Sequence, residues 1–265
     1  MKRYPCFLLL SVLLLLTPIA VFAFDADADV SSLLKGFDGC FVLHNLQSGQ
    51  TLKHNASRCD QRMPPCSTFK IPHALVALEL GVVKNPDDVV KWDGSPQIFK
   101  SWERDHNLYS AIENSVVWYF QRIAEKVGYE KEREYLEKFD YGNKNADRNL
   151  TSFWLDQGPL EITANEQIAF LKKFHENTLP VSQRSFEIVK KAILFKQTDE
   201  YILRGKTGSG RFEQGGGFGW YVGILECGDD AYLFATNIEG AQNASGKTAR
   251  EITIKILTEL EMLDG

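Results

Sequence analysis

Short apolar runs lie at both ends of this chain, and runs of this length between turn residues are typical of β-strands. These runs are rich in β-branched and aromatic residues, and Gly, Asp or Ser residues separate them. A short turn at residues 228–230 joins the last two runs, which predicts a hairpin. We therefore expect strands at residues 40–44, 51–53, 201–206, 219–226 and 231–238.

The middle of the chain follows a helical period instead. An apolar stripe over residues 67–80 stops at Gly81, and a second one over residues 110–127 stops at Gly128. Glycine directly after a periodic run is a frequent end of a helix. Further helices are expected at residues 30–34, 131–138 and 245–262.

A capping box opens one more helix in this region. Thr163 and Glu166 have the spacing at which each side chain can bond the backbone N–H of the other residue, and the helix runs through His175. Because the first and last thirds supply strands and the middle supplies helices, the pattern predicts an α/β fold of the α+β type. A helical subdomain over about residues 82–180 is inserted in it, and the cleft between the two parts is the expected binding site.

The first 23 residues differ from the rest. Two cations at Lys2 and Arg3 precede an apolar run over residues 7–16, and small residues lead to Ala23. This pattern is typical of a cleaved secretory signal peptide, with an uncleaved membrane anchor as the alternative. We expect a mature domain of residues 24–265, exported to a bacterial periplasm and not bound to the membrane after cleavage.

The formal net charge of −5 becomes −7 once Lys2 and Arg3 are removed, and the chain has no basic cluster. Nucleic acid is therefore not an expected partner. The five histidines form no close pair of the kind that binds zinc, so no metal is expected. Four cysteines remain after export, at positions 40, 59, 66 and 227. A disulfide between Cys59 and Cys66 is a hypothesis, because the pairing of cysteines cannot be read from the sequence.

The most informative motif is Ser67-Thr68-Phe69-Lys70. Positions three apart share a helix face, so the Lys70 amine can reach the Ser67 hydroxyl and accept its proton. A serine needs such a base to act as a nucleophile at neutral pH. The alternative is an ordinary serine at a helix start with a solvated lysine, since this tetrapeptide pattern also occurs by chance.

Further motifs follow in order along the chain. Ser115-Val116-Val117 offers a second hydroxyl, Tyr141-Gly142-Asn143 lies in a turn, and Trp154-Leu155 comes shortly after it. Lys206-Thr207-Gly208 is expected at the end of a strand, where a cation and a hydroxyl can bind a carboxylate. The backbone N–H of Ser209 is then free to stabilise an oxyanion.

Together these motifs resemble those of the class D, oxacillinase-type serine β-lactamases, over essentially the whole mature chain. Related enzymes carry Ser-Asp-Asn where this chain has Ser115-Val116-Val117. The resemblance implies the penicillin-interacting serine enzyme fold, with a mostly antiparallel sheet flanked by helices. It also implies hydrolysis of small-molecule β-lactams without a tightly bound cofactor. Carbon dioxide or bicarbonate would be needed to carboxylate Lys70.

The resemblance also implies a role for each matching residue. Ser67 would be the nucleophile, carboxylated Lys70 the base, Ser115 a proton relay and Trp154 the donor that holds the modified lysine. The expected substrate-binding residues are Trp102, Val117, Leu155, Lys206, Thr207, Gly208, Ser209 and Arg250. The capping box explains Glu166, so we assign it no catalytic role.

Two alternatives share the same motifs. One is a penicillin-sensing receptor domain that stays acylated, and the other is a peptidoglycan transpeptidase or carboxypeptidase. A sensor needs transmembrane and intracellular portions, and a transpeptidase usually carries further domains or an anchor, so an exported free-standing chain favours the β-lactamase. The substrate spectrum, which depends on residues 209–217, and the oligomeric state stay open.

Overall fold

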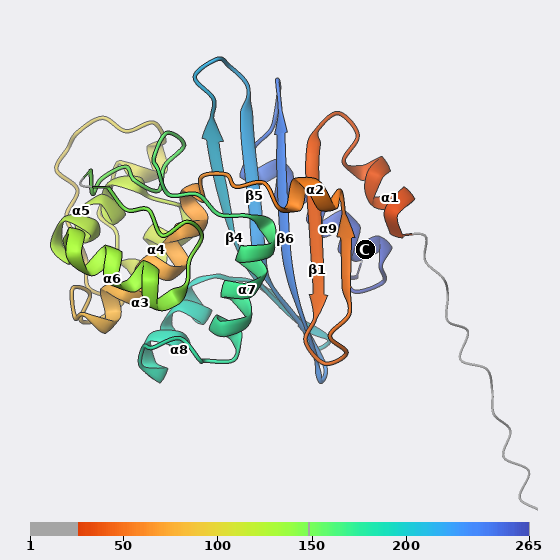
Figure 1. Cartoon of the computed structure of the whole chain (residues 1–265). Helices are drawn as coiled ribbons and strands as arrows, with labels where there is room; N and C mark the ends of the chain where they lie inside the picture. Colours follow the sequence, from red (N-terminus) through yellow and green to blue (C-terminus); the bar gives the residue numbers. More distant parts are fainter. Residues whose placement is uncertain (1–25, 148, 265) are drawn as a thin grey trace, which may run out of the picture.

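A six-stranded antiparallel sheet forms the centre of the protein in a computed structural model that describes residues 26–147 and 149–264. The strand order is β2-β1-β6-β5-β4-β3, so strands from the two ends of the chain lie side by side (Figure 1). Their bounds are β1 Asp38–Asn45, β2 Thr51–His54, β3 Leu194–Gln197, β4 Tyr201–Arg211, β5 Gly217–Cys227 and β6 Asp230–Gly240. This confirms the expected sheet, whereas the predicted signal peptide lies outside the described residues.

Helices lie on both faces of the sheet (Figure 1). On one face α1 and α9 bury an apolar cluster that includes Phe41, Tyr221 and Phe234. On the other face α7 packs against β1 and β6, and the remaining helices gather beside it. The helices are α1 Ala26–Leu33, α2 Ala56–Cys59, α3 Lys70–Glu79, α4 Leu108–Glu113, α5 Val117–Val127, α6 Tyr129–Phe139, α7 Ala164–His175, α8 Gln183–Ala192 and α9 Gly246–Glu259.

Local sequence signals account for several of these boundaries. Thr163 accepts from the Glu166 N–H at 2.9 Å while Glu166 accepts from the Thr163 N–H at 2.9 Å, which confirms the capping box of α7. Gly128 has a φ of 79° between α5 and α6, a conformation that glycine adopts without steric cost. Cys227 pairs with Asp230 across a two-residue turn, which confirms the hairpin of β5 and β6.

Three expectations about elements were wrong in detail. Residues 110–127 form two helices, α4 and α5, because the chain turns at Ser115 with a φ of 55°. The stretch from residue 67 begins as a 3₁₀ turn, Cys66–Phe69, before α3. Lys206-Thr207-Gly208 lies in the middle of β4, since this strand continues to Arg211 along β5.

The proposed disulfide between Cys59 and Cys66 is absent. All four described cysteines are free thiols. Cys59 ends α2, and its Sγ lies 3.4 Å from the His54 carbonyl oxygen and 3.9 Å from that of Phe41, on the β1–β2 hairpin. The thiol is therefore held against the sheet and not against Cys66.

Candidate active site

Ser67 and Lys70 meet at the junction of the 3₁₀ turn and α3. The Lys70 Nζ donates to the Ser67 Oγ over 2.8 Å, as the three-residue spacing predicts. Ser67 is half-buried, whereas Lys70 is 1 % exposed. Cys66 precedes them with a φ of 47°, an uncommon conformation for a residue with a side chain. Strain of this kind is frequent at functional positions.

The surroundings of Lys70 favour a neutral amine. Burial, followed by the positive charge of Lys206, lowers the pKa of Lys70 well below its usual range. Its Nζ lies 5.2 Å from the centre of the Phe120 ring, and no described carboxylate forms an ion pair with it. A neutral lysine amine can accept a proton, so Lys70 is suited to activate the hydroxyl that it contacts.

Ser115 lies between α4 and α5 and faces β4. The Lys206 Nζ donates to the Ser115 Oγ, and also to the Thr207 carbonyl oxygen at 3.1 Å. Burial, with a smaller effect of the nearby Arg250 charge, lowers the pKa of Lys206 to about 7. The break in the predicted helix therefore brings the second hydroxyl to a second buried lysine.

Strand β4 presents an open edge beside Ser67. β3 pairs with it only from Ile202 to Arg204, and the Gly205 N–H donates outward to Ile193. Because backbone groups alternate along a strand, the N–H groups of Thr207 and Ser209 point toward the same edge, where β3 is no longer paired. This edge can supply an oxyanion donor.

Gly208 lets β4 approach the turn that carries Ser67. A Cβ at this position would lie 2.8 Å from the Pro65 carbonyl oxygen and 3.3 Å from the Thr68 backbone nitrogen. Thr68 is itself fixed, because its hydroxyl donates to Pro65 at 2.7 Å and accepts from Gln167 at 3.0 Å. The close contact between β4 and the 3₁₀ turn is therefore built from backbone on both sides.

Trp154 is fully buried next to the 3₁₀ turn that carries Ser67. Its ring stacks on Phe69 with centroids 5.9 Å apart and meets the edge of His73 at 5.3 Å. The indole Nε1–H has no hydrogen-bond partner within the described part of the chain. A buried donor without a partner costs about 1–3 kcal/mol, so a bound acceptor is the expected use of this group.

The apolar residues of the predicted site have less specific surroundings. Val117 and Leu155 are half-buried and pack against the core. The Trp102 indole donates to the Asn114 carbonyl oxygen at 2.8 Å, which fixes it to the segment just before Ser115. Arg250 extends from α9, and its guanidinium lies 5.0 Å from the centre of the Phe195 ring.

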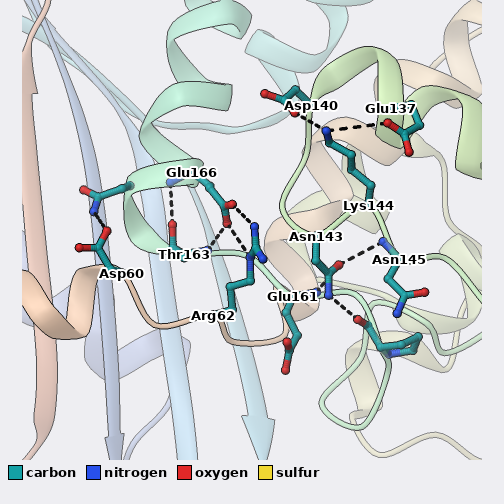
Figure 2. Close-up of polar contacts among 12 residues, drawn as sticks. Asp60, Arg62, Glu137, Asp140, Asn143, Lys144, Asn145, Glu161, Thr163 and Glu166 are labelled. Carbon is teal, nitrogen blue, oxygen red and sulfur yellow. Dashed lines mark hydrogen bonds and ion pairs between the residues drawn. The ribbon is translucent and has the colours of Figure 1, made fainter.

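Glu166 and Asn143 have structural partners, as Figure 2 shows. Besides capping α7, Glu166 pairs with Arg62 at 2.5 Å. The Asn143 side chain donates to Pro159 at 2.8 Å and accepts from the Glu161 N–H at 3.1 Å. The Tyr-Gly-Asn motif therefore fixes the segment that carries Trp154. No group of residues that could hold a metal ion is found in the described ranges.

Two features of this region were not predicted from the sequence. His73 lies one helical turn after Lys70, and its Nε2 is 2.8 Å from Glu132 on α6, with both side chains buried. Phe195 contacts Arg250 across 55 residues of sequence. A His at three residues beyond Lys70 was visible in the sequence, but its partner on another helix was not.

Residues 39–258 match the penicillin binding protein transpeptidase domain family. The chain therefore belongs to this family, and its Ser67–Lys70 pair lies beside the edge of β4. Beta-lactamase OXA-48 of Klebsiella pneumoniae is 42% identical over 226 residues, 85% of this chain and 84% of that protein. The probable beta-lactamase YbxI of Bacillus subtilis is 37% identical over 235 residues, 89% of this chain and 85% of that protein.

Solved structures agree with these relatives. The class D β-lactamase from Bacillus subtilis has a TM-score of 0.84 at 37% identity, covering 89% of this chain and 97% of that one. The chain is a member of the class D β-lactamases, a class of hydrolases that act on the β-lactam amide bond. The C-terminal domain of the Bacillus licheniformis BlaR penicillin receptor is also similar, with a TM-score of 0.85 at 33% identity, covering 89% of this chain and 96% of that one.

Proposed function

We propose that this protein hydrolyses β-lactam antibiotics through an acyl-enzyme on Ser67. The observation that carries the proposal is the 2.8 Å contact between Ser67 and a buried Lys70 that has a strongly lowered pKa. The Ser67 oxygen bonds to the lactam carbonyl carbon as its proton passes to the base at Lys70. The ring C–N bond then breaks, and Ser115 passes a proton to the leaving nitrogen.

Backbone and cationic groups stabilise the charges of this reaction. The N–H groups of Ser67 and Ser209 bind the oxyanion, since the Gly208 contact brings β4 against the 3₁₀ turn. Lys206, Thr207 and Arg250 bind the substrate carboxylate. Burial is the main cause of the lowered pKa of Lys206 and the Arg250 charge lowers it further, so a bound carboxylate would favour the charged form of this lysine.

Lys70 is the proposed site of carboxylation by carbon dioxide. A neutral, buried amine is the form that reacts with carbon dioxide, and the unpaired Trp154 N–H offers a donor to the oxygens that result. When present, the carbamate supplies a general base for acylation and for deacylation by water. Val117 and Leu155 would limit how water reaches it, and Trp102 would form a wall of the substrate cleft.

A penicillin sensor is the second candidate, favoured by the similarity to the BlaR receptor domain. The regulatory protein BlaR1 of Bacillus licheniformis is 36% identical, and the matched region is 36% of that protein. A sensor and a hydrolase both form an acyl-serine, so acylation does not separate them. Only rapid deacylation does, and the base at Lys70 supports it.

The acyl-enzyme is tested by mass spectrometry of the protein quenched in acid during reaction with benzylpenicillin. We expect the mass of one substrate added to the chain, on the peptide that holds Ser67. The Ser67→Ala variant should show neither this adduct nor hydrolysis. An adduct on another residue, or hydrolysis by Ser67→Ala, would contradict the mechanism.

We also propose that the chain is exported and cleaved after Ala23, leaving one domain over residues 24–265, with residues 82–180 as a helical subdomain. The composition of the first 23 residues supports this. Separately, the helices within residues 26–147 and 149–264 are too short or too polar to span a bilayer. Sequencing the N-terminus of protein recovered from a periplasmic fraction tests export and cleavage. A chain that keeps Lys2 and Arg3 would contradict cleavage.

A further inference from the structure

The Arg250 side chain lies near another cation, Lys206, and contacts an aromatic ring. This side chain forms no hydrogen bond or ion pair with the residues that the structure describes, and the guanidinium lies 5.0 Å from the centre of the Phe195 ring. It is also close enough to Lys206 to lower the pKa of that lysine. Two like charges repel, so an unsupported arginine side chain would turn away from this position.

Phe195 is placed by an irregularity in the sheet. In the pairing of β3 with β4, Leu194 lies opposite Arg204 and Lys196 lies opposite Leu203, so Phe195 is the extra residue of a β-bulge. A bulge re-aims the side chain that it contains, and bulges are frequent beside active sites. Phe195 is 44% exposed at this position.

We propose that Phe195 is a positioning residue that holds Arg250 where the substrate carboxylate binds. The face of the ring attracts the guanidinium and offsets its repulsion from Lys206, so the cation is in place before the substrate arrives. This role makes the enzyme selective for β-lactams with a free carboxylate. It rests on the proposed function of Arg250 in binding that carboxylate.

Removing the Phe195 ring should lower kcat/KM modestly. An exposed cation–π contact corresponds to a factor of about two to five in the population of the held conformer. Phe195→Ala should therefore lower kcat/KM for benzylpenicillin by about two- to fivefold. If deacylation limits turnover, kcat should not change, because water attacks the acyl-enzyme after the carboxylate has been recognised.

The experiment compares benzylpenicillin with its methyl ester, which lacks the charge. Phe195→Tyr keeps an aromatic face and should restore wild-type kcat/KM. Leu194→Ala is the matched control, because Leu194 is adjacent, apolar and 43% exposed but is paired with Arg204 and is not the extra residue of the bulge. For the ester, Phe195→Ala should have no effect on kcat/KM. In an Arg250→Ala background, Phe195→Ala should have no effect on kcat/KM for either substrate.

The outcomes separate this inference from the role of Arg250 itself. Arg250→Ala should lower kcat/KM for benzylpenicillin by about ten- to hundredfold and leave the ester unaffected. If Arg250→Ala changes nothing, the proposed carboxylate site is wrong. If Arg250→Ala has its effect but Phe195→Ala does not, or acts equally on the ester, only the positioning role of Phe195 is wrong.

Discussion

Replacing Trp154 by Phe tests the use of the unpaired indole N–H. The side chain is fully buried, and the substitution removes one N–H donor and part of one ring. A hydrogen bond to a charged group is worth about 1.5–3 kcal/mol, which corresponds to a factor of about ten to one hundred in an equilibrium constant. At fixed carbon dioxide, carboxylation of Lys70 should weaken by this factor, and turnover should fall with it.

The assay is the hydrolysis of a chromogenic cephalosporin as a function of added bicarbonate. Trp154→Phe should start low and rise toward the wild-type rate, while ¹³C NMR with labelled bicarbonate shows the carbamate signal rising in parallel. Trp220→Phe is the control, because Trp220 is also buried but its N–H already donates to Pro64 at 3.0 Å. It should lose stability without gaining bicarbonate dependence. Full turnover by Trp154→Phe without added bicarbonate would refute the reasoning.

Three further predictions concern buried charge and close packing. The pKa of Lys206 is lowered to about 7 in the folded protein, so between about pH 7 and the ordinary lysine pKa of 10.5 the unfolded chain binds more protons than the folded one. The free energy of unfolding should therefore rise with pH over this range. Urea titrations of Lys206→Met should show a smaller rise. Gly208→Ala would push β4 from the Pro65 carbonyl oxygen and lower kcat/KM by about a hundredfold, and because backbone must move, it should also lower the midpoint of thermal unfolding. Glu132→Ala should cost about 3–5 kcal/mol of stability in urea unfolding, and His73→Leu in the same chain should recover much of it.

Sequence motifs whose residues are close along the chain predicted local structure well. The capping box at Thr163 and the contact between Ser67 and Lys70 each need only three residues of spacing, and both form as expected. Signals that depend on the rest of the fold were less complete. The chain turns at Ser115 with a positive φ, within a stretch that local periodicity predicts as one helix, and the Ser115 hydroxyl accepts from Lys206 on the distant strand β4.

Sequence patterns did not predict the short elements α2 and β3 or the longer helix α8, which begins after the cap residue Ser182. β3 has four exposed residues, so it lacks the alternation that marks a strand, and its place is set by pairing with β4. Likewise, the contact of Phe195 with Arg250 and the pair of His73 with Glu132 join distant segments. Such contacts require the tertiary fold and cannot be read from local spacing.

Counting turnovers tests the central claim most directly. The purified protein is mixed with a large excess of a chromogenic cephalosporin, and the product is divided by the amount of enzyme. The account predicts many turnovers by the wild type and none by Lys70→Ala, because the base that activates Ser67 and the deacylating water is lost. A burst of about one equivalent that then stops would contradict a hydrolase and identify a penicillin-binding protein that stays acylated.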